Sequence, residues 1–264
     1  MRSSVSNKPY DSKFYKNRSE LTFSSAEVIV PWLLRTVKPK SVIDIGCGNG
    51  CWLAVFQKHG LQDFLGVDGN WVPSDQLEIP ASHFEMSDLL HAYKSNRAFN
   101  LVMSLEVAEH LPPRSAPEFI KSLTALGPVV LFGAAIPLQG GVGHINEQWP
   151  AYWIELFEKQ NYVAVDCLRG LFWKSPGVAA WYVQNTFFFI REDVLNDYPE
   201  LLEEEKKYSM GKHPIVHPSQ YLRRIDELRD PMTYSVKSFL KVAPHLLKRA
   251  FVKRCKHLVG KNGR

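Results

Sequence analysis

Residues 41–50 read Ser-Val-Ile-Asp-Ile-Gly-Cys-Gly-Asn-Gly, and they predict a strand, a glycine turn and the start of a helix. The β-branched run Ser41–Gly46 predicts a buried strand, and residues 49–59 predict the helix that follows it. Glycines at the turn let the backbone approach a ligand and adopt positive φ, and the start of the helix offers free N–H groups. Asp44 lies inside the strand, where a buried carboxylate must be matched by donors. A ligand ammonium together with the loop N–H groups would match it.

Six further apolar runs extend this strand into a sheet. Strands are expected over residues 64–68, 82–86, 99–104, 128–133, 162–167 and 183–191, with further helices near 116–126 and 150–160. Continuous apolar strands separated by helices indicate a parallel sheet covered on both faces, and right-handed crossovers make it doubly wound. The predicted fold is therefore α/β, a Rossmann-like doubly wound sheet of seven mostly parallel strands, closed by one antiparallel member. A Gly-rich loop is expected over 138–148, and an aromatic insertion over 168–181.

The spacing of the glycines separates two kinds of nucleotide-binding protein. The turn reads G-x-G-x-G from Gly46 to Gly50, and Cys51 stands where the dinucleotide fingerprint has Gly or Ala. Asp68 and Asp88 follow at the ends of the second and third predicted strands. Carboxylates at consecutive strand ends lie on the edge where doubly wound sheets bind ligands. A nicotinamide-dependent reductase is therefore a distant alternative.

The sequence D-I-G-C-G-N-G of residues 44–50 resembles the first motif of class I S-adenosylmethionine (SAM)-dependent methyltransferases. The resemblance implies that this loop wraps the methionine part of SAM, that Asp68 binds both ribose hydroxyls, and that Asp88-Leu89 contacts adenine. Residues 100–111, NLVMSLEVAEHL, resemble the family's fourth-strand motif, whose end lies beneath the sulfonium, although Asn100 stands where the family often has Asp. The likeness covers residues 40–135. It implies SAM as cofactor, S-adenosylhomocysteine as product, and a cofactor-binding set of Asp44, Gly46, Cys47, Gly48, Gly50, Asp68, Gly69, Asp88, Leu89, Ser104, Leu105 and Glu106.

Candidate catalytic residues follow the fourth and fifth predicted strands. Methyl transfer depends mainly on positioning donor and acceptor, and an alcohol acceptor also needs help losing its proton. His144 lies in the loop after the fifth strand, and Glu109 and His110 follow the fourth, so these three are the catalytic candidates. The alternative is that His144, Asn146 and Glu147 only pin the loop and cap the helix that follows.

A metal ion is a second hypothesis for the same residues. Glu106-x-x-Glu109-His110 with the distant His144 resembles the E-x-x-E-H…H set of small-RNA terminal 2′-O-methyltransferases, in which a divalent ion grips a vicinal diol. Residues one apart on a helix point in different directions, and many methyltransferases carry E-x-x-E-H without a metal. A divalent metal is therefore not the favoured expectation.

The net charge of +5 is concentrated at the C-terminus. Residues 231–264 contain nine Lys/Arg and no Asp/Glu, whereas the other 230 residues carry 23 basic and 27 acidic side chains. Apolar residues recur near helical spacing over 236–259, interrupted at Pro244. Such a segment could lie on an anionic membrane surface or pack as a terminal helix on its own domain. A nucleic-acid partner is not expected, because the interleaved aromatic pattern is missing.

The remaining composition fits an ordinary globular protein. The four scattered cysteines, including Cys167 and Cys255, form no disulfide framework or zinc pattern. No signal-peptide core and no bilayer-length apolar stretch is found, so a cytoplasmic location is expected, with the tail as a candidate for peripheral contact at the inner face of the membrane. The expected domains are a helical lead-in (1–38), a class I methyltransferase domain (39–192) and a helical C-terminal extension with the basic tail (193–264).

The expected acceptor is a hydroxyl of a sugar or glycan intermediate, either a small molecule or lipid-linked. The loop H-I-N-E-Q-W (144–149) with its flanking aromatics resembles methyltransferases of bacterial surface-polysaccharide biosynthesis, and a basic tail would bring the enzyme to the membrane. Aromatic platforms with Arg169 and Gln184 would suit a sugar ring, and would equally suit a packed lid. The alternatives are a small-metabolite or natural-product O- or N-methyltransferase and a non-catalytic SAM-binding partner subunit.

Overall fold

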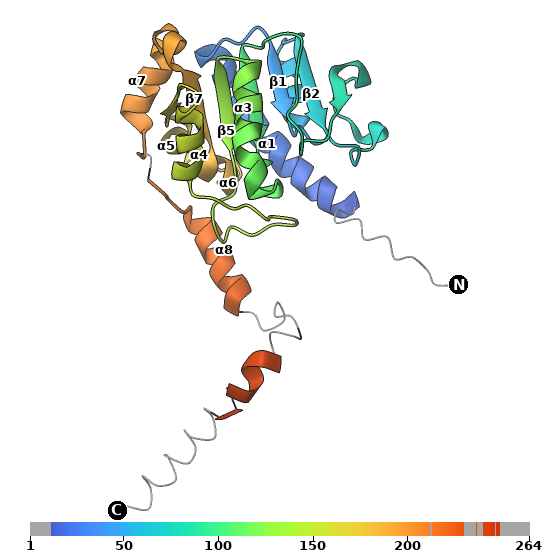
Figure 1. The fold of residues 1–264 in the computed structure, drawn as a ribbon, viewed down its shortest axis with the longest axis vertical. Coiled ribbons are helices and arrows are strands. Elements are labelled where there is room, and N and C mark those ends of the chain that lie inside the picture. Colours follow the sequence, from blue (N-terminus) through green and yellow to red (C-terminus); the bar gives the residue numbers. More distant parts are fainter. Residues whose placement is uncertain (1–11, 212, 230–235, 237–239, 246, 249–264) are drawn as a thin grey trace, which may run out of the picture. The chain divides into compact units, whose positions relative to one another are not determined.

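The computed structural model describes residues 12–211, 213–229, 236, 240–245 and 247–248 (Figure 1). The chain divides into two compact units, residues 1–220 and 221–264. The domain boundaries expected after residues 38 and 192 both fall inside the first unit. Among the described residues, no helix combines the length and the hydropathy that crossing a membrane requires.

A seven-stranded sheet forms the centre of the first unit, in the order β3-β2-β1-β4-β5-β7-β6. All neighbouring strands are parallel except that β7 runs antiparallel to both β5 and β6. The predicted doubly wound, mostly parallel sheet is therefore confirmed. The strands are β1 Val42–Ile45, β2 Phe64–Asp68, β3 Phe84–Met86, β4 Leu101–Leu105, β5 Val129–Gly133, β6 Tyr162–Val165 and β7 Phe187–Arg191.

Eight α-helices are described along the chain, joined in places by short 3₁₀ turns. The helices are α1 Ser12–Thr36, α2 Cys51–Lys58, α3 Ala116–Leu126, α4 Pro150–Glu158, α5 Leu168–Phe172, α6 Ala180–Asn185, α7 Pro199–Tyr208 and α8 Pro218–Arg229. The stretch 134–149 contains neither helix nor strand, in agreement with the loop expected there. Residues 236, 240–245 and 247–248 are also helical, so Pro244 lies inside a helical stretch, 240–245, where an interruption was expected.

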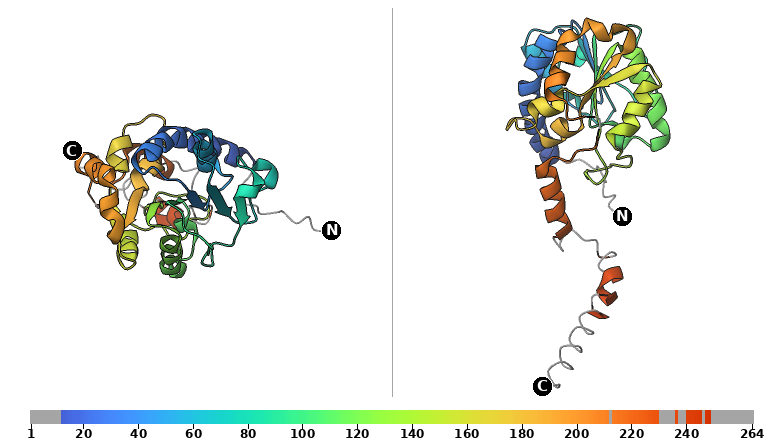
Figure 2. Two further views of the ribbon diagram at one scale, coloured as in Figure 1. Left: turned by 90° about the horizontal axis from the view of Figure 1, so that it is seen from above. Right: turned by 90° about the vertical axis from the view of Figure 1, so that its left-hand side faces the viewer.

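The two faces of the sheet pack against different helical layers. Val42 and Met103 belong to a hydrophobic core that includes residues of α1, α2, α5, α6 and α7. Ile43 and Val102 belong to the other core, with α3 and α4. Figure 2 shows the sheet between these two layers. Because neighbouring residues of a strand point to opposite faces, a central strand covered on both sides is apolar at most positions, as the sequence predicted. Asp44 in β1 and Ser104 in β4 are the buried polar exceptions in the central strands.

The segment between β6 and β7 differs in detail from the prediction. The aromatic insertion contains α5 and the start of α6, and the strand expected over 183–191 begins only at Phe187. Residues 183–185 belong to α6 because Gln184 and Asn185 turn their side chains into a buried polar cluster instead of alternating across the sheet. The strand prediction was wrong there because the apolar strand pattern was extended back over Gln184 and Asn185, whose amide side chains are buried.

The centre of the sheet contains a topological switch point. β1 lies between β2 and β4, with β2 and β3 on one side and β4 and β5 on the other. Ligands of doubly wound sheets bind in the crevice at the carboxyl ends of the strands at such a point. Residues 46–50, which follow β1, and residues 106–110, which follow β4, are therefore the first place to look for a site.

Candidate functional site

The loop between β1 and α2 depends on glycine for its conformation and for its close packing. Gly46, Gly48 and Gly50 have φ of +84°, +57° and +87°, where a residue with a side chain is strained. A Cβ added to Gly46 would lie 2.3 Å from Cγ2 of Val107, and one added to Gly50 would lie 2.8 Å from Cγ1 of Ile79. The loop is thus held against the segment that follows β4.

The Asp68 carboxylate fastens this loop to the end of β2. It accepts hydrogen bonds from the amides of Gly48 and Gly69, both at 2.6 Å. Asp68 is 5% exposed, and burial raises the pKa of its carboxyl, while the two amide bonds act in the opposite direction. A carboxylate has about four acceptor positions, so capacity for ligand hydroxyls remains. The structure places Asp68 and Gly69 beside the loop, and their contact with ribose stays a prediction.

Asp44 is a buried carboxylate that lacks a donor. It is 3% exposed at the core of β1, and no hydrogen bond to its carboxylate is found among the described residues. Burial, with a smaller contribution from the charge of Asp68, raises its pKa from the ordinary 3.8 to about 7. Since an ionised carboxylate buried without a partner is costly, the site is arranged for a cationic ligand group that the chain itself does not supply.

The other predicted contacts around this loop differ in kind. Cys47 is buried, and burial together with the charges of Asp44 and Asp68 raises its thiol pKa, so it is a packing residue of the loop and not a nucleophile. Leu89 is buried. Asp88 is exposed, and its Oδ1 accepts the Leu90 amide at 3.0 Å, closing a turn. This bond gives Asp88 a local structural role, and its contact with adenine stays a prediction.

The end of β4 carries two unusual polar residues. The Ser104 hydroxyl is fully buried and has no hydrogen-bond partner in the described part of the chain. Glu106 is a non-glycine residue with φ of +59°, and such strained residues concentrate at functional sites. With Leu105, which is also buried, they lie where the resemblance expects the cofactor.

A buried polar cluster accounts for the Glu106 carboxylate. Its oxygens accept hydrogen bonds from the amides of Gln139 at 2.8 Å and Asn185 at 2.7 Å. Gln184 donates to Gln139 and Asn185, and its carbonyl accepts the backbone amide of His217 at 2.7 Å. Sequence reasoning missed Gln139 and Asn185, because nothing in their sequence neighbourhood signals that three separate segments converge on one carboxylate.

Glu109, His110 and His144 do come together. Each offers a donor atom within 4.8 Å of the other two, and the His110 and His144 rings meet edge to face at 4.8 Å. Nε2 of His144 lies 4.0 Å from Oε1 of Glu109, which is fully buried. Glu106 is not in this group, since its carboxylate is taken up by the polar cluster. The four-ligand pattern suggested by E-x-x-E-H is therefore reduced to three donors.

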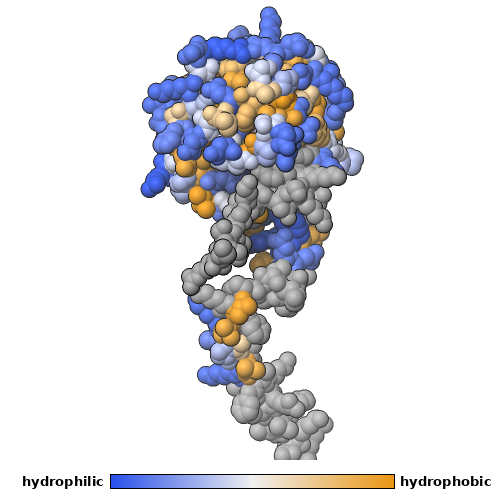
Figure 3. Space-filling view, turned by 90° about the vertical axis from the view of Figure 1, so that its right-hand side faces the viewer, coloured by the Kyte–Doolittle hydropathy of each residue, from blue (hydrophilic) through white to orange (hydrophobic). Residues whose placement is uncertain are grey.

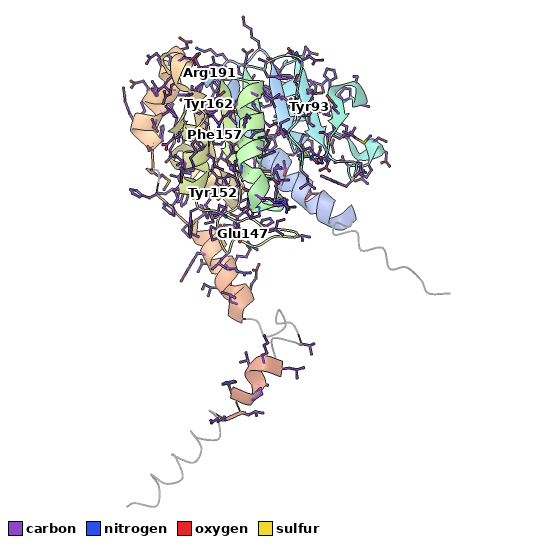
Figure 4. The ribbon with its side chains drawn as sticks, in the orientation of Figure 1. Tyr93, Glu147, Tyr152, Phe157, Tyr162 and Arg191 are labelled. Carbon is purple, nitrogen blue, oxygen red and sulfur yellow. The ribbon has the colours of Figure 1, made fainter. Side chains whose placement is uncertain are left out.

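Glu147 pins the loop that carries His144. Its carboxylate accepts the amides of Leu138 and Gly140, both at 2.8 Å, and bonds Nδ1 of His144 at 2.9 Å. Figure 4 labels Glu147 on this loop, ahead of Tyr152 in α4. A Cβ on Gly141 would lie 2.1 Å from Nε2 of His144, so the loop backbone covers that nitrogen. Catalysis by His144 therefore requires the loop to move away from the ring.

The suggested sugar platform around Arg169 is not available. Arg169 is fully buried, where Asp166 holds it through two hydrogen bonds at 2.8 and 2.7 Å. Its guanidinium lies 4.1 Å from the centre of the Phe187 ring. This ion pair ties α5 to the end of β6, and Arg169 cannot also face a ligand.

The fold and these strand-end groups define a doubly wound protein whose switch point carries a glycine loop and two buried carboxylates, an arrangement suited to a cationic ligand group. The chain belongs to the methyltransferase family, whose domain model matches residues 18–175. The class I fold and SAM as cofactor, both expected from the sequence, are confirmed at the level of this family. The roles of individual site residues stay predictions.

Similar proteins are found in several bacteria. Ubiquinone biosynthesis O-methyltransferases of Coxiella burnetii are 28% identical over 99 residues, which cover 34% of this chain and 40% of those proteins. The chain thus spans about two fifths of the length of the curated relatives that it matches. A putative O-methyltransferase of Nostoc punctiforme superposes with a TM-score of 0.50 at 13% identity, covering 67% of this chain and 59% of that one. The structure of magnesium protoporphyrin IX methyltransferase of Synechocystis with bound SAM superposes with a TM-score of 0.49 at 15% sequence identity. The match covers 69% of this chain and 85% of that one.

Proposed function

We propose that this chain is a SAM-dependent methyltransferase that methylates a hydroxyl of a sugar or glycan intermediate. SAM supplies an electrophilic methyl group on a sulfonium, and its methionine part carries an ammonium. In the transfer, a bond forms between the acceptor oxygen and the methyl carbon, and the carbon–sulfur bond breaks with its electrons on sulfur. The hydroxyl proton must leave, so a base is needed.

The observation that carries the proposal is the Asp44 carboxylate. It is buried beside the glycine loop, close to Asp68 and without a donor from the described residues. A ligand ammonium at this place would replace the missing partner and favour the ionised carboxylate. The N-terminal end of α2 carries a partial positive charge that would favour the ligand carboxylate. This combination suits an amino-acid-bearing nucleoside better than a dinucleotide, whose pyrophosphate would be repelled by Asp44.

We assign to His144 the role of the base that takes the proton of the acceptor hydroxyl. Glu147 bonds Nδ1 at 2.9 Å, so it would orient the ring and leave Nε2 as the acceptor, in the manner of a base held by a carboxylate. Nε2 is buried and has no hydrogen-bond partner among the described residues, which supports a role beyond pinning the loop. Opening of residues 138–147 would admit the acceptor, and closure would exclude water.

The acceptor chemistry that we propose follows from the polarity of the site. The Gly-rich loop over residues 138–148 brings backbone amides and carbonyls, together with polar side chains, to the β4–β5 side, and polar groups there suit a polyhydroxylated molecule more than an apolar one. The Coxiella relatives are ubiquinone biosynthesis O-methyltransferases, which favours the alternative of a small-molecule O-methyltransferase. Both alternatives predict an oxygen acceptor.

The test is methyl transfer from labelled SAM to a panel of free sugars, nucleotide sugars, lipid-linked glycans and phenolic small molecules, read by mass. The proposal expects a gain of one methyl on a sugar hydroxyl. Methylation of phenols alone would replace the glycan acceptor by the small-molecule alternative. Tight binding of S-adenosylhomocysteine without transfer to any acceptor would favour the non-catalytic SAM-binding subunit.

Glu109, His110 and His144 are also a candidate site for a divalent cation. One carboxylate and two imidazoles are a donor set that suits divalent transition ions, and Glu109, His110 and His144 provide it. If an ion binds there, His144 is a ligand and cannot also take the acceptor proton. Turnover that survives exhaustive dialysis against EDTA would leave His144 as the base, whereas loss with recovery on adding Mn²⁺ or Zn²⁺ would assign these residues to a metal.

A further inference from the structure

The C-terminal unit contains a helical segment with an exposed apolar side. Val236, Leu240 and Leu247 are 74%, 65% and 71% exposed, and all three lie in described helical residues. In the sequence they are spaced i, i+4 and i+11, a spacing that would place them on one face of a continuous α-helix. Figure 3 shows hydrophobic side chains in this segment beside hydrophilic ones. An isolated exposed apolar residue needs no explanation, but an aligned set does.

The same segment is positively charged throughout. Residues 231–264 hold nine Lys/Arg and no Asp/Glu. Lys241 and Lys248 are exposed and seven residues apart in the sequence, a spacing that would put both on one face of a continuous helix, next to the apolar face. In the sequence the apolar spacing continues at Ala250 and Phe251, which lie outside the described residues, with basic residues on either side.

We propose that residues 231–264 bind the surface of an anionic lipid bilayer. A helix of this kind lies in the interface with its apolar face at the acyl boundary and its lysines at the headgroups. Long lysine side chains suit this position because their stems are apolar and their charges reach the water. The inference stands on the tail alone and does not depend on which acceptor is methylated.

Two other partners fit the same surface less well. RNA or DNA would satisfy the positive charge but would leave the apolar face uncovered. A second copy of the chain would cover the apolar face. The nine basic residues of one tail would then lie against those of the other, and this segment has no acidic residue to neutralise them. An anionic bilayer is the partner that matches both the charge and the apolar face.

The experiment is co-sedimentation of the full-length chain with vesicles of phosphatidylcholine alone or mixed with phosphatidylglycerol. The chain is expected to pellet with the mixed vesicles only, and to be released at about 1 M salt, where the screening length falls to about 3 Å. Leu240→Glu with Leu247→Glu should reduce partitioning by about tenfold or more. Lys241→Gln with Lys248→Gln should weaken it by about thirtyfold.

The matched control is Lys206→Gln with Lys207→Gln, which removes the same charge from exposed positions of α7 and should leave partitioning unchanged. Binding of S-adenosylhomocysteine, measured on every variant, shows that the methyltransferase domain is folded and separates failure of the tail from failure of the proposed function. The proposal is overturned if wild type stays in the supernatant with anionic vesicles. It is equally overturned if the Leu240/Leu247 variant pellets like wild type, or if the chain binds RNA but not vesicles.

Discussion

The Gly48 amide donates a hydrogen bond of 2.6 Å to the Asp68 carboxylate, across 20 residues of sequence. This contact joins the turn after β1 to the end of β2, so the shape of the glycine loop depends on the neighbouring strand. A second amide, that of Gly69, bonds the other oxygen at the same distance. The groups that would hold the cofactor are therefore built as one unit and not as independent residues.

Replacement of Asp68 should damage cofactor binding severely. Asp68→Ala leaves two amides without their acceptor, and each hydrogen bond to a charged group contributes about 1.5–3 kcal/mol. We expect the affinity for S-adenosylhomocysteine to fall by about a hundredfold or more, measured by isothermal titration calorimetry. Asp75→Ala, at an exposed acidic residue of a nearby 3₁₀ turn, is the control and should bind like wild type. Equal affinities of the two variants would contradict this role of Asp68.

Asp44 should make the ligand-free chain less stable as the pH rises. Its pKa is 3.8 ordinarily and about 7 in the fold, so between these values the folded chain keeps a proton that the unfolded chain has lost. The free energy of unfolding must then decrease with pH across this window, by about 4 kcal/mol in total.

Asp44→Asn removes that dependence. In urea unfolding without ligand, the variant is expected to be more stable than wild type at about pH 8, by up to about 4 kcal/mol, and equally stable at about pH 4. A variant less stable than wild type at the higher pH would mean that Asp44 is ionised and compensated in the free chain, in conflict with its lack of a donor.

Gly46 should tolerate no side chain. Gly46→Ala combines a positive φ, which costs about 1–2 kcal/mol, with a Cβ placed 2.3 Å from Val107, and overpacking costs about 1–3 kcal/mol more. Gly60→Ala is the control, because Gly60 also has positive φ (+96°) but no neighbour within 4 Å of the added carbon. Urea unfolding should show a larger loss for Gly46→Ala. Equal losses would mean that Val107 yields without cost.

His144 and Glu147 should affect turnover more than binding. His144→Ala is expected to lower kcat by about 10²–10⁴-fold while leaving the affinity for S-adenosylhomocysteine unchanged. Glu147→Gln, which weakens both the orientation of the ring and the closure of the loop, should lower kcat less. Unchanged turnover of His144→Ala would reduce the residue to a structural role in the loop.

The sheet could be predicted from the sequence because its signal is local. Apolar runs such as Phe64–Asp68 and Val129–Gly133 contain their own strand pattern, and the glycines of the first turn mark the switch to a helix. The convergence of Asp44 and Asp68 followed from topology, since parallel strands that are neighbours end at the same edge. Family resemblance added the cofactor, which no spacing alone specifies.

The rest depended on contacts between distant segments. The carboxylate of Glu106 was expected near the cofactor or a metal, but Gln139 and Asn185 bind it, and neither position has a sequence signature. Arg169 was a candidate for ligand binding until its burial against Asp166 became visible. Polar residues in aromatic-rich insertions are ambiguous because a charged side chain can be solvent-facing or fully paired, and only tertiary packing decides between these outcomes.

The most direct test of the cofactor site is titration calorimetry of S-adenosylhomocysteine at about pH 6 and about pH 8. A pKa of about 7 for Asp44 in the free chain leaves roughly a tenth of the molecules ionised at the lower pH and most of them at the higher. The affinity of wild type should therefore rise by about tenfold between the two, with proton release on binding, and Asp44→Asn should bind weakly at both. An affinity that does not change with pH, or an Asp44→Asn variant that binds like wild type, would contradict the pairing of this carboxylate with the ligand cation.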